Sequence, residues 1–121
     1  MATIPYTTVS LKQIPNEKVH IFTWPTMTFT GTDVGTPVEL PGSADRSVQV
    51  TGTPGTGGNV RIEGSMDGVT YAVLTDPQGN DLNIGSAKIE TIMEVVRYIR
   101  PRITAGDGAT SLTVQMLMRR S

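Results

Sequence analysis

The chain of 121 residues contains no cysteine and a single histidine, His20. Disulfide bonds and cysteine-ligated metal sites are therefore excluded, and a metal site would have to be built mainly from carboxylates. No stretch reaches the roughly 18 apolar residues of a membrane-spanning helix, and the N-terminus lacks the basic and then apolar pattern of a signal peptide. We expect no membrane partner, and a soluble protein that stays inside the cell until it is released.

Charged and aromatic residues are also scarce. Ten basic and eleven acidic residues give a net charge of −1, so we expect no nucleic-acid partner, because non-specific binding to DNA or RNA requires neutralisation of phosphates. Glycine (13 residues) and proline (8 residues) are plentiful instead, and their spacing is typical of short strands joined by turns. At this length we expect one domain with one core.

Apolar and polar residues alternate in residues 48–51, 60–63 and 112–118, which places one side of each strand on a core and the other in water. We expect residues 46–74 to form a meander of three successive strands. A glycine-rich turn would follow the first strand, and a tight turn at Asp67-Gly68 would follow the second. The alternation over residues 112–118 is the clearest of the chain.

The alternation of apolar and polar residues is not enough to interpret two further stretches, residues 18–29 and 87–96. Residues 18–29 predict a strand with His20, Phe22 and Trp24 on one face, bent at the next proline because proline cannot donate to the ladder. Residues 87–96 fit either one or two helical turns or a strand with a bulge, and their β-branched residues favour the strand. The whole pattern predicts about eight or nine short strands and no long helix, which means an all-β sandwich, jelly roll or barrel.

Residues 1–17 contain Pro5 and Pro15, which suit an edge strand or an extended arm rather than a central strand. As an arm, this segment would add to a neighbouring subunit by strand pairing, and as an edge strand it would be an ordinary terminus. We expect an extended N-terminal arm or edge strand over residues 1–17, followed by a single β-sandwich domain over residues 18–121.

Candidate catalytic and metal-binding groups are few. His20 lies beside aromatic residues in a predicted strand, and one base cannot form a Ser/His/Asp arrangement. Glycine-rich residues 52–58 join two strands instead of leading into a helix, so they predict no phosphate-binding loop. Four aspartates lie in turns, where they fit either calcium binding or ordinary turn chemistry; they are Asp67, Asp76, Asp81 and Asp107. We expect no enzyme, with no catalytic residues, no cofactor and no metal.

Half of the ten basic residues lie in the last quarter of the chain: Arg97, Arg100, Arg102, Arg119 and Arg120. If the strands at residues 97–103 and 112–118 pair, these arginines form one basic patch. Such a patch is either a solvated rim with local ion pairs to Glu63, Glu90 and Glu94, or a surface that docks onto an acidic protein, because the planar arginine fork suits carboxylates.

Two motifs have counterparts in a known fold. GSMDGVTY (residues 64–71) resembles the strand-turn-strand of discoidin-like jelly rolls, and VRYIRP (residues 96–101) resembles another strand of that fold. The likeness implies a jelly-roll-like β-sandwich.

A second resemblance covers most of the chain, from about His20 to Arg120. It is carried by the stretches VHIFTW, GTPVELPGSADRSVQVTGT, GGNVRIEGSMDGVTYAVLTDPQGN and VRYIRPRITAGDGATSLTVQMLMRR. Together these stretches resemble small virion proteins of tailed bacteriophages, of the capsid decoration (cement) type. The resemblance implies a β-sandwich that sits on the capsid exterior and bridges neighbouring major capsid protein subunits.

We therefore expect a capsid decoration protein whose partner is the major capsid protein and which self-associates as a dimer or trimer on the capsid. Weak contacts repeated at symmetric sites would stabilise the shell. The alternatives are a tail or baseplate structural protein and a carbohydrate-binding module for host attachment, which would need an exposed Trp24 as its platform. The predicted partner-binding residues are Ile4, Tyr6, Val9, Leu11, Trp24, Arg119 and Arg120.

Overall fold

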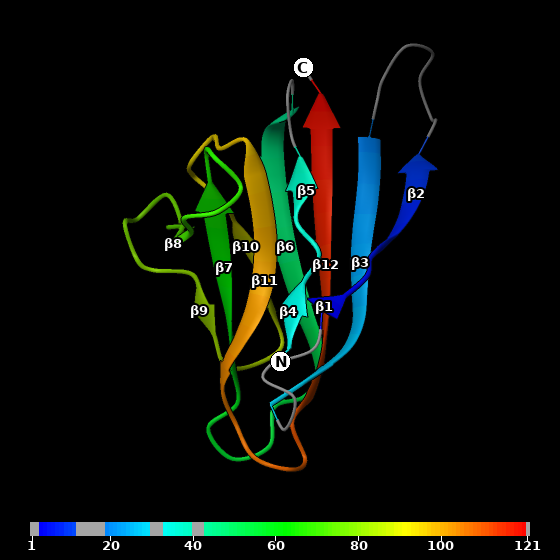
Figure 1. Ribbon diagram of the computed structural model, residues 1–121, viewed down its shortest axis with the longest axis vertical. Helices are drawn as coiled ribbons and strands as arrows, with labels where there is room; N and C mark the ends of the chain where they lie inside the picture. The colour runs from blue at the N-terminus through cyan, green and yellow to red at the C-terminus, as the bar shows by residue number, and fades with distance from the viewer. Residues whose placement is uncertain (1–2, 12–18, 30–32, 40–42, 121) are drawn as a thin grey trace.

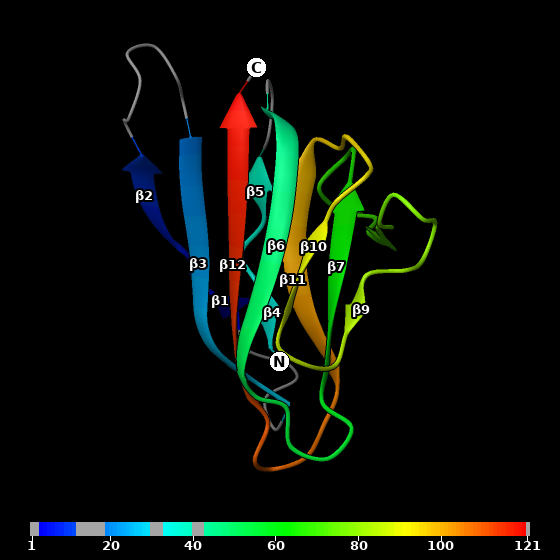
Figure 2. The same ribbon diagram turned by 180° about the vertical axis from the view of Figure 1, so that it is seen from behind.

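The computed structural model describes residues 3–11, 19–29, 33–39 and 43–120. These residues form two β-sheets that pack face to face (Figures 1 and 2). The described part of the chain contains no helix, and therefore no helix that could cross a membrane. The all-β sandwich predicted from the sequence is confirmed, and its jelly-roll type stays a prediction.

The first sheet, sheet A, has seven strands with β11 near its centre. β11 pairs with β7 along most of its length and with the short strands β4 and β5 on its other side. β1 pairs with β4 in parallel, and β8 and β9 pair with β7. The strands are β1 (Thr3–Ile4), β4 (Val34–Gly35), β5 (Val38–Glu39), β7 (Asn59–Ser65), β8 (Ala72–Val73), β9 (Asn83–Ile84) and β11 (Tyr98–Ala105).

The second sheet, sheet B, has five antiparallel strands in the order β10-β6-β12-β3-β2. They are β2 (Thr7–Leu11), β3 (Val19–Thr28), β6 (Ser43–Thr53), β10 (Lys88–Thr91) and β12 (Ser111–Arg120). The strand predicted at residues 112–118 is therefore the central strand of this sheet. Of the stretch at residues 87–96, Lys88–Thr91 forms a strand and the rest is irregular, so the strand alternative is confirmed over these four residues, and their register with β6 shows no bulge.

The core lies between the two sheets and is formed by the inward side of each alternating strand. Val48, Val50, Val114 and Met116 from sheet B and Val60, Ile62 and Ile99 from sheet A are fully buried. The predicted meander is wrong in one respect, because β6 belongs to sheet B and β7 to sheet A. Residues 52–58 therefore carry the chain from one sheet to the other. Alternation identifies the buried side of a strand, but it does not identify the sheet.

Strand β3 continues past Pro25 by means of a bulge. Its register with β12 shifts between the pairs Leu112↔Met27 and Val114↔Trp24, and Thr26 has a φ of 49°. A bulge inserts an unpaired residue and bends the strand, which is how the predicted bend at the proline is realised. Because of the bulge, Trp24 and Met27 are both fully buried although three positions separate them.

Trp24 lies at a close junction between the sheets. Its indole N–H donates to the carbonyl oxygen of Thr36 at 3.0 Å. A Cβ at Gly35 would lie 2.6 Å from the ring of Pro101 and 2.7 Å from the indole, so only glycine allows this approach. Pro101 is tolerated inside β11 because residues 100 and 101 fall between the parts of β11 that pair with β4 and β5, where no ladder bond is lost.

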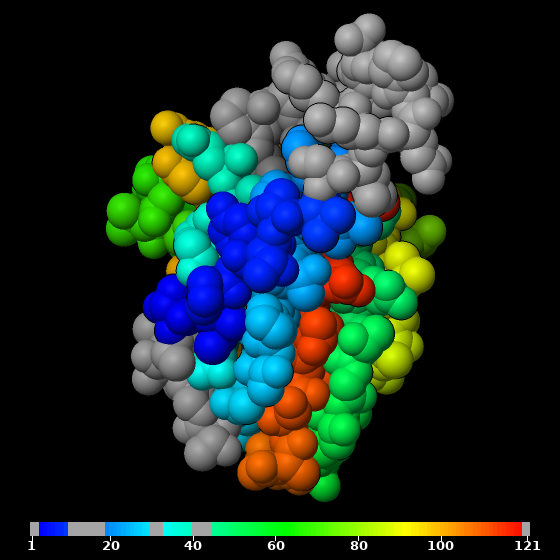
Figure 3. All heavy atoms as spheres, turned by 90° about the vertical axis from the view of Figure 1, so that its right-hand side faces the viewer, coloured from blue at the N-terminus to red at the C-terminus, as the bar shows by residue number. Residues whose placement is uncertain are grey.

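The N-terminal segment joins the two sheets along one side of the sandwich. Its first strand pairs with β4 of sheet A and its second with β3 of sheet B, and residues 3–9 lie across this side in Figure 3 (dark blue). Between them, the Tyr6 ring contacts the rings of Phe22 and Trp24 edge-on, with centroids 5.3 and 5.6 Å apart. In this structure residues 3–11 therefore form edge strands of the chain's own sandwich.

The connection between β7 and β8 is longer than the predicted two-residue turn and is organised by Asp67. Gly68 has the positive φ, 80°, whereas Asp67 acts through its side chain. Its Oδ1 accepts hydrogen bonds from the backbone N–H groups of Thr70 and Val69 and from the Ser65 hydroxyl, each 2.8 Å long. These bonds stabilise the ionised carboxylate and lower the pKa of Asp67 to about 2.

This lowered pKa predicts a loss of stability in acid. A carboxyl group with a lower pKa in the folded state stabilises the fold above its ordinary pKa and loses this contribution as the pH falls through the folded value. We expect the free energy of unfolding to fall between about pH 4 and pH 2, and to fall less steeply in Asp67→Asn, whose amide oxygen still accepts hydrogen bonds but does not titrate. Urea unfolding at a series of pH values measures this slope.

The matched control is Asp81→Asn, because Asp81 is exposed and no side-chain hydrogen bond to it is found among the described residues. This variant should keep the wild-type slope. Equal slopes for the Asp67 and Asp81 variants would contradict the assignment to Asp67.

Candidate partner-binding faces

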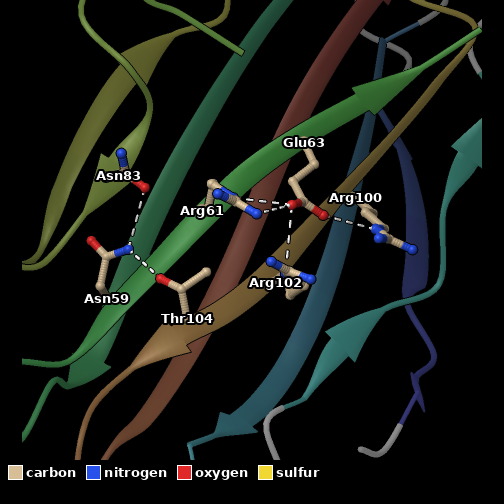
Figure 4. Close-up of polar contacts among 7 residues, drawn as sticks. All are labelled: Asn59, Arg61, Glu63, Asn83, Arg100, Arg102 and Thr104. Atoms are coloured by element: carbon tan, nitrogen blue, oxygen red, sulfur yellow. Dashed lines mark hydrogen bonds and ion pairs between the residues drawn. The ribbon is translucent and has the colours of Figure 1, made fainter. Parts of the chain in front are cut away.

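The outer face of sheet A carries a cluster of four charged side chains, three arginines around one buried carboxylate. Glu63 and Arg61 come from β7, and Arg100 and Arg102 come from β11 (Figure 4). The strands place Glu63 directly opposite Arg100 and place Arg61 opposite Arg102. We call these residues the Glu63 cluster. All four are outward positions of their strands, since Ile62, which alternates with two of them, belongs to the core.

Both oxygens of Glu63 are occupied. Oε2 accepts hydrogen bonds from Nε and Nη2 of Arg61 at 3.0 and 2.7 Å, and lies 3.5 Å from Nε of Arg102. Oε1 accepts a hydrogen bond from Nε of Arg100 at 3.1 Å. The Glu63 side chain is only 2% exposed, whereas the three arginines are between 21% and 37% exposed. The arginines therefore cover the carboxylate and themselves remain in contact with solvent.

Tyr71 lies beside the cluster and fixes one of its arginines. The guanidinium carbon of Arg100 lies 3.6 Å from the centre of the Tyr71 ring, a short cation–π contact. Burial raises the pKa of the Tyr71 phenol, and its hydroxyl is buried without a hydrogen-bond partner among the described residues. Nearby, Arg97, the residue before β11, forms an ion pair with Glu39 at 2.8 Å.

The outer face of sheet B has the opposite character. Val9, Ile21 and Leu117 stand next to one another in register across β2, β3 and β12, with Ser47 of β6 completing the row. Val9 is 54% exposed and Leu117 is 38% exposed. Figure 3 shows β3, β12, β6 and β10 side by side, in light blue, orange-red, green and yellow.

A shallow hollow lies beside this row, lined by Ile21, Leu117, Ile89 and the polar side chains of Ser47, Gln49 and Gln115. Ile89, on the edge strand β10, is 64% exposed. None of the residues that line the row or the hollow is charged, and the next outward positions of β12 and β6, Arg119 and Asp45, pair with each other toward the end of the sheet. We call this surface the neutral face: Val9, Ile21, Ser47, Gln49, Ile89, Gln115 and Leu117. Exposed aliphatic side chains in a continuous group on a flat sheet are typical of interaction surfaces.

The basic patch predicted near the C-terminus does not form. β11 and β12 lie in different sheets, so Arg97, Arg100 and Arg102 are separated from Arg119. Arg119 is exposed at the end of β12 and pairs with Asp45 of β6 at 2.5 Å. The Arg120 side chain lies outside the described residues. The two strands are close in sequence, but β11 pairs with β7, β4 and β5, and β12 pairs with β6 and β3.

Trp24 cannot bind a partner as a surface platform, because its side chain is 0% exposed. The carbohydrate-binding alternative required an exposed Trp24, and the prediction that Trp24 is exposed is wrong. The reason is that the alternation of β3 places Trp24 on the same inward side as Phe22, where it packs against the core. His20 lies on that side too and is half-buried.

The N-terminal residues predicted to bind a partner divide into three groups. Ile4 and Tyr6 are half-buried and pack against the core of their own chain. Val9 is exposed on the neutral face. The Leu11 side chain lies outside the described residues. Of the predicted partner-binding residues, Val9 and Arg119 are therefore the two whose side chains are described and exposed.

Three of the four aspartates in the turns accept backbone hydrogen bonds. Besides Asp67, Asp76 accepts hydrogen bonds from the N–H groups of Gln78 and Asn80 at 2.9 and 3.0 Å, and Asp107 accepts hydrogen bonds from the N–H groups of Thr56 and Ala109, both at 2.9 Å. Within the described ranges, no group of three histidine, aspartate or glutamate side chains converges as a metal site would require.

Val9 was predicted to bind a partner, and Glu63 was among the predicted ion-pair partners of the arginines, but the convergence of three arginines on Glu63 was not predicted. Arg61 and Glu63, like Arg100 and Arg102, are polar residues at alternate positions of strands, which indicates an outer face but does not indicate that the four side chains meet.

Comparisons with models of protein families, with curated proteins and with solved structures give no match.

The Glu63 cluster predicts a stability effect of its central carboxylate. Glu63→Gln removes the only negative charge among three guanidinium groups and puts an amide N–H against N–H donors. We expect the free energy of unfolding to fall by about 1–3 kcal/mol, and by less at high salt, because salt screens repulsion between the arginines. Urea unfolding at low salt and at about 0.5 M salt measures both effects.

Glu39→Gln is the control, since it removes an exposed glutamate of the same sheet that pairs with a single arginine, Arg97. This variant should be as stable as the wild type. A Glu63→Gln variant with unchanged stability, or with a loss that does not depend on salt, would contradict the account of the cluster.

Proposed function

We propose that this protein is a non-enzymatic structural protein of a tailed-bacteriophage virion, a capsid decoration protein that binds the outer surface of the shell and bridges neighbouring major capsid protein subunits. The proposal starts from the sequence resemblance. The observation that supports it best is the neutral face, a group of exposed aliphatic side chains on rigid, paired strands.

The neutral face fits protein recognition for physical reasons. Valine, leucine and isoleucine side chains lose contact with water when a partner covers them, and each fully buried side chain contributes about 1.5–3 kcal/mol. Uncharged neighbours such as Gln49 and Gln115 can be covered without leaving an isolated charge in the interface. Because the strands are held in register by their neighbours, the surface is already ordered before binding, which lowers the entropic cost of association.

The contribution of one copy is small, and repetition would make it effective. Association costs several kcal/mol in lost translational and rotational freedom, so one face of this size supports modest affinity. On a symmetric shell the same contact is repeated at every equivalent site, and copies that also contact one another as dimers or trimers bind with higher avidity. Its place would be the capsid exterior, which it would reach from the host cytoplasm during assembly.

The test uses the full chain and shells assembled from the major capsid protein encoded in the same genome. Wild-type protein should co-sediment with shells, and electron microscopy should place it on their outer surface. Leu117→Asp should reduce the affinity about tenfold or more, because it would bury a charge in the interface. Its circular dichroism should be unchanged, since Leu117 points outward.

Val69→Asp is the matched control. Val69 is 83% exposed, and it lies in the β7–β8 connection, away from the neutral face. It should bind shells as the wild type does. Equal loss of binding in both variants, or localisation of the wild-type protein on tails instead of shells, would overturn the proposal.

A further inference from the structure

We propose that the Glu63 cluster is a second docking site, on the opposite side of the sandwich from the neutral face, which binds carboxylate side chains on an acidic protein surface. That the acidic surface belongs to a capsid subunit rests on the proposed function. The carboxylate chemistry rests on the cluster itself.

The first argument is charge. Three guanidinium groups surround one carboxylate, so the cluster has a net charge of two positive units. Within the described part of the chain, no second acidic side chain makes an ion pair with Arg61, Arg100 or Arg102. A cluster that only held the two strands together would need one arginine for its glutamate. The additional arginines repel one another, and a partner that supplies negative charge removes this repulsion.

The second argument is the direction of the donors. Arg100 and Arg102 approach Glu63 through Nε, so their terminal nitrogens take no part in these contacts. Figure 4 shows the terminal nitrogens of Arg100 pointing away from Glu63. A guanidinium group presents its donors in a planar fork, and the unused edge of this fork matches the two oxygens of a carboxylate.

The third argument is order before binding. Arg61 makes two hydrogen bonds to Glu63, and Arg100 lies on the ring of Tyr71 at 3.6 Å. Long arginine side chains normally lose considerable rotamer freedom when a partner fixes them, and here much of that cost has already been met within the fold. The buried Glu63 therefore has a clear role, since it positions arginines that would otherwise move independently.

The size of the cluster favours a protein partner over a nucleic acid. Nucleic-acid binding relies on a track of basic residues that neutralises many phosphates in succession. The cluster is a single island on one face of a chain with net charge −1, and the neighbouring Arg97 is already paired with Glu39. Two carboxylates on adjacent positions of a protein surface would neutralise the two positive charges of the Glu63 cluster completely.

The experiment is an NMR titration of the full chain with a peptide of six glutamates, followed through the arginine Nε–H signals at about 0.1 M salt, where charges beyond about 10 Å are screened. The signals of Arg100 and Arg102 should shift, and a peptide of six glutamines should leave them unchanged. Arg102→Gln should weaken binding about three- to fivefold, as expected for one partly exposed ion pair, and Arg102→Lys should weaken it less.

Arg97→Gln is the matched control, because it removes the same charge just before β11 but outside the cluster. It should bind the peptide as tightly as the wild type, within about twofold. Arg102→Gln should also unfold at a urea concentration no lower than the wild type, since Glu63 keeps Arg61 and Arg100 and an unmatched charge is removed. If Arg102 only stabilised the fold, its replacement would lower the urea concentration at which the protein unfolds.

Three results would overturn the inference: equal weakening by the Arg97 and Arg102 variants, lower stability of Arg102→Gln without weaker binding, or tighter binding of inorganic phosphate or of a thymidine oligonucleotide than of the glutamate peptide. The titration contains no shells. If the wild-type chain binds the peptide but no shell, the proposed function fails and the carboxylate site stands.

Discussion

The burial of Trp24 between the sheets is the contact on which the rest of the sandwich depends. An indole N–H is costly to bury unless it is hydrogen-bonded, and the carbonyl oxygen of Thr36 is available because the chain leaves sheet A between β4 and β5. The same break accommodates Pro101 inside β11, and the missing side chain of Gly35 lets the indole and the proline ring approach. The gap between β4 and β5 therefore supplies an acceptor for the indole N–H, tolerates Pro101 in β11 and leaves room for the Trp24 ring.

The N-terminal segment completes this junction. Tyr6 covers the edge of Trp24 and Phe22 while the strands on either side of it pair with different sheets. A chain that crosses between sheets in this way closes one side of a sandwich, where the core would otherwise be open to water. The role of residues 3–11 in this structure is therefore to stabilise their own chain, and of these residues it is Val9 that adds an exposed aliphatic side chain to the neutral face.

Two outer faces of different chemistry follow from one core. Each strand contributes alternate residues to the inside, so the outward positions are free to differ between the sheets. Sheet A uses them for arginines around Glu63, and sheet B uses them for aliphatic and uncharged polar residues. A chain with net charge −1 can present a positive island because several of its acidic residues, such as Asp67, Asp76 and Asp107, are bound in turns at other places.

What the sequence alone determined is local. Side-chain direction alternates with a period of two along any strand, so the all-β class, the positions of the main strands and the inward residues of β6, β7 and β12 could be read directly from the pattern. The tertiary structure alone decided which strands pair. Inward faces of valine, isoleucine and methionine are equally apolar, and nothing in them specifies a partner strand. For that reason the sequence could not show that Arg100 meets Glu63, 37 positions away, while Arg119 lies in the other sheet.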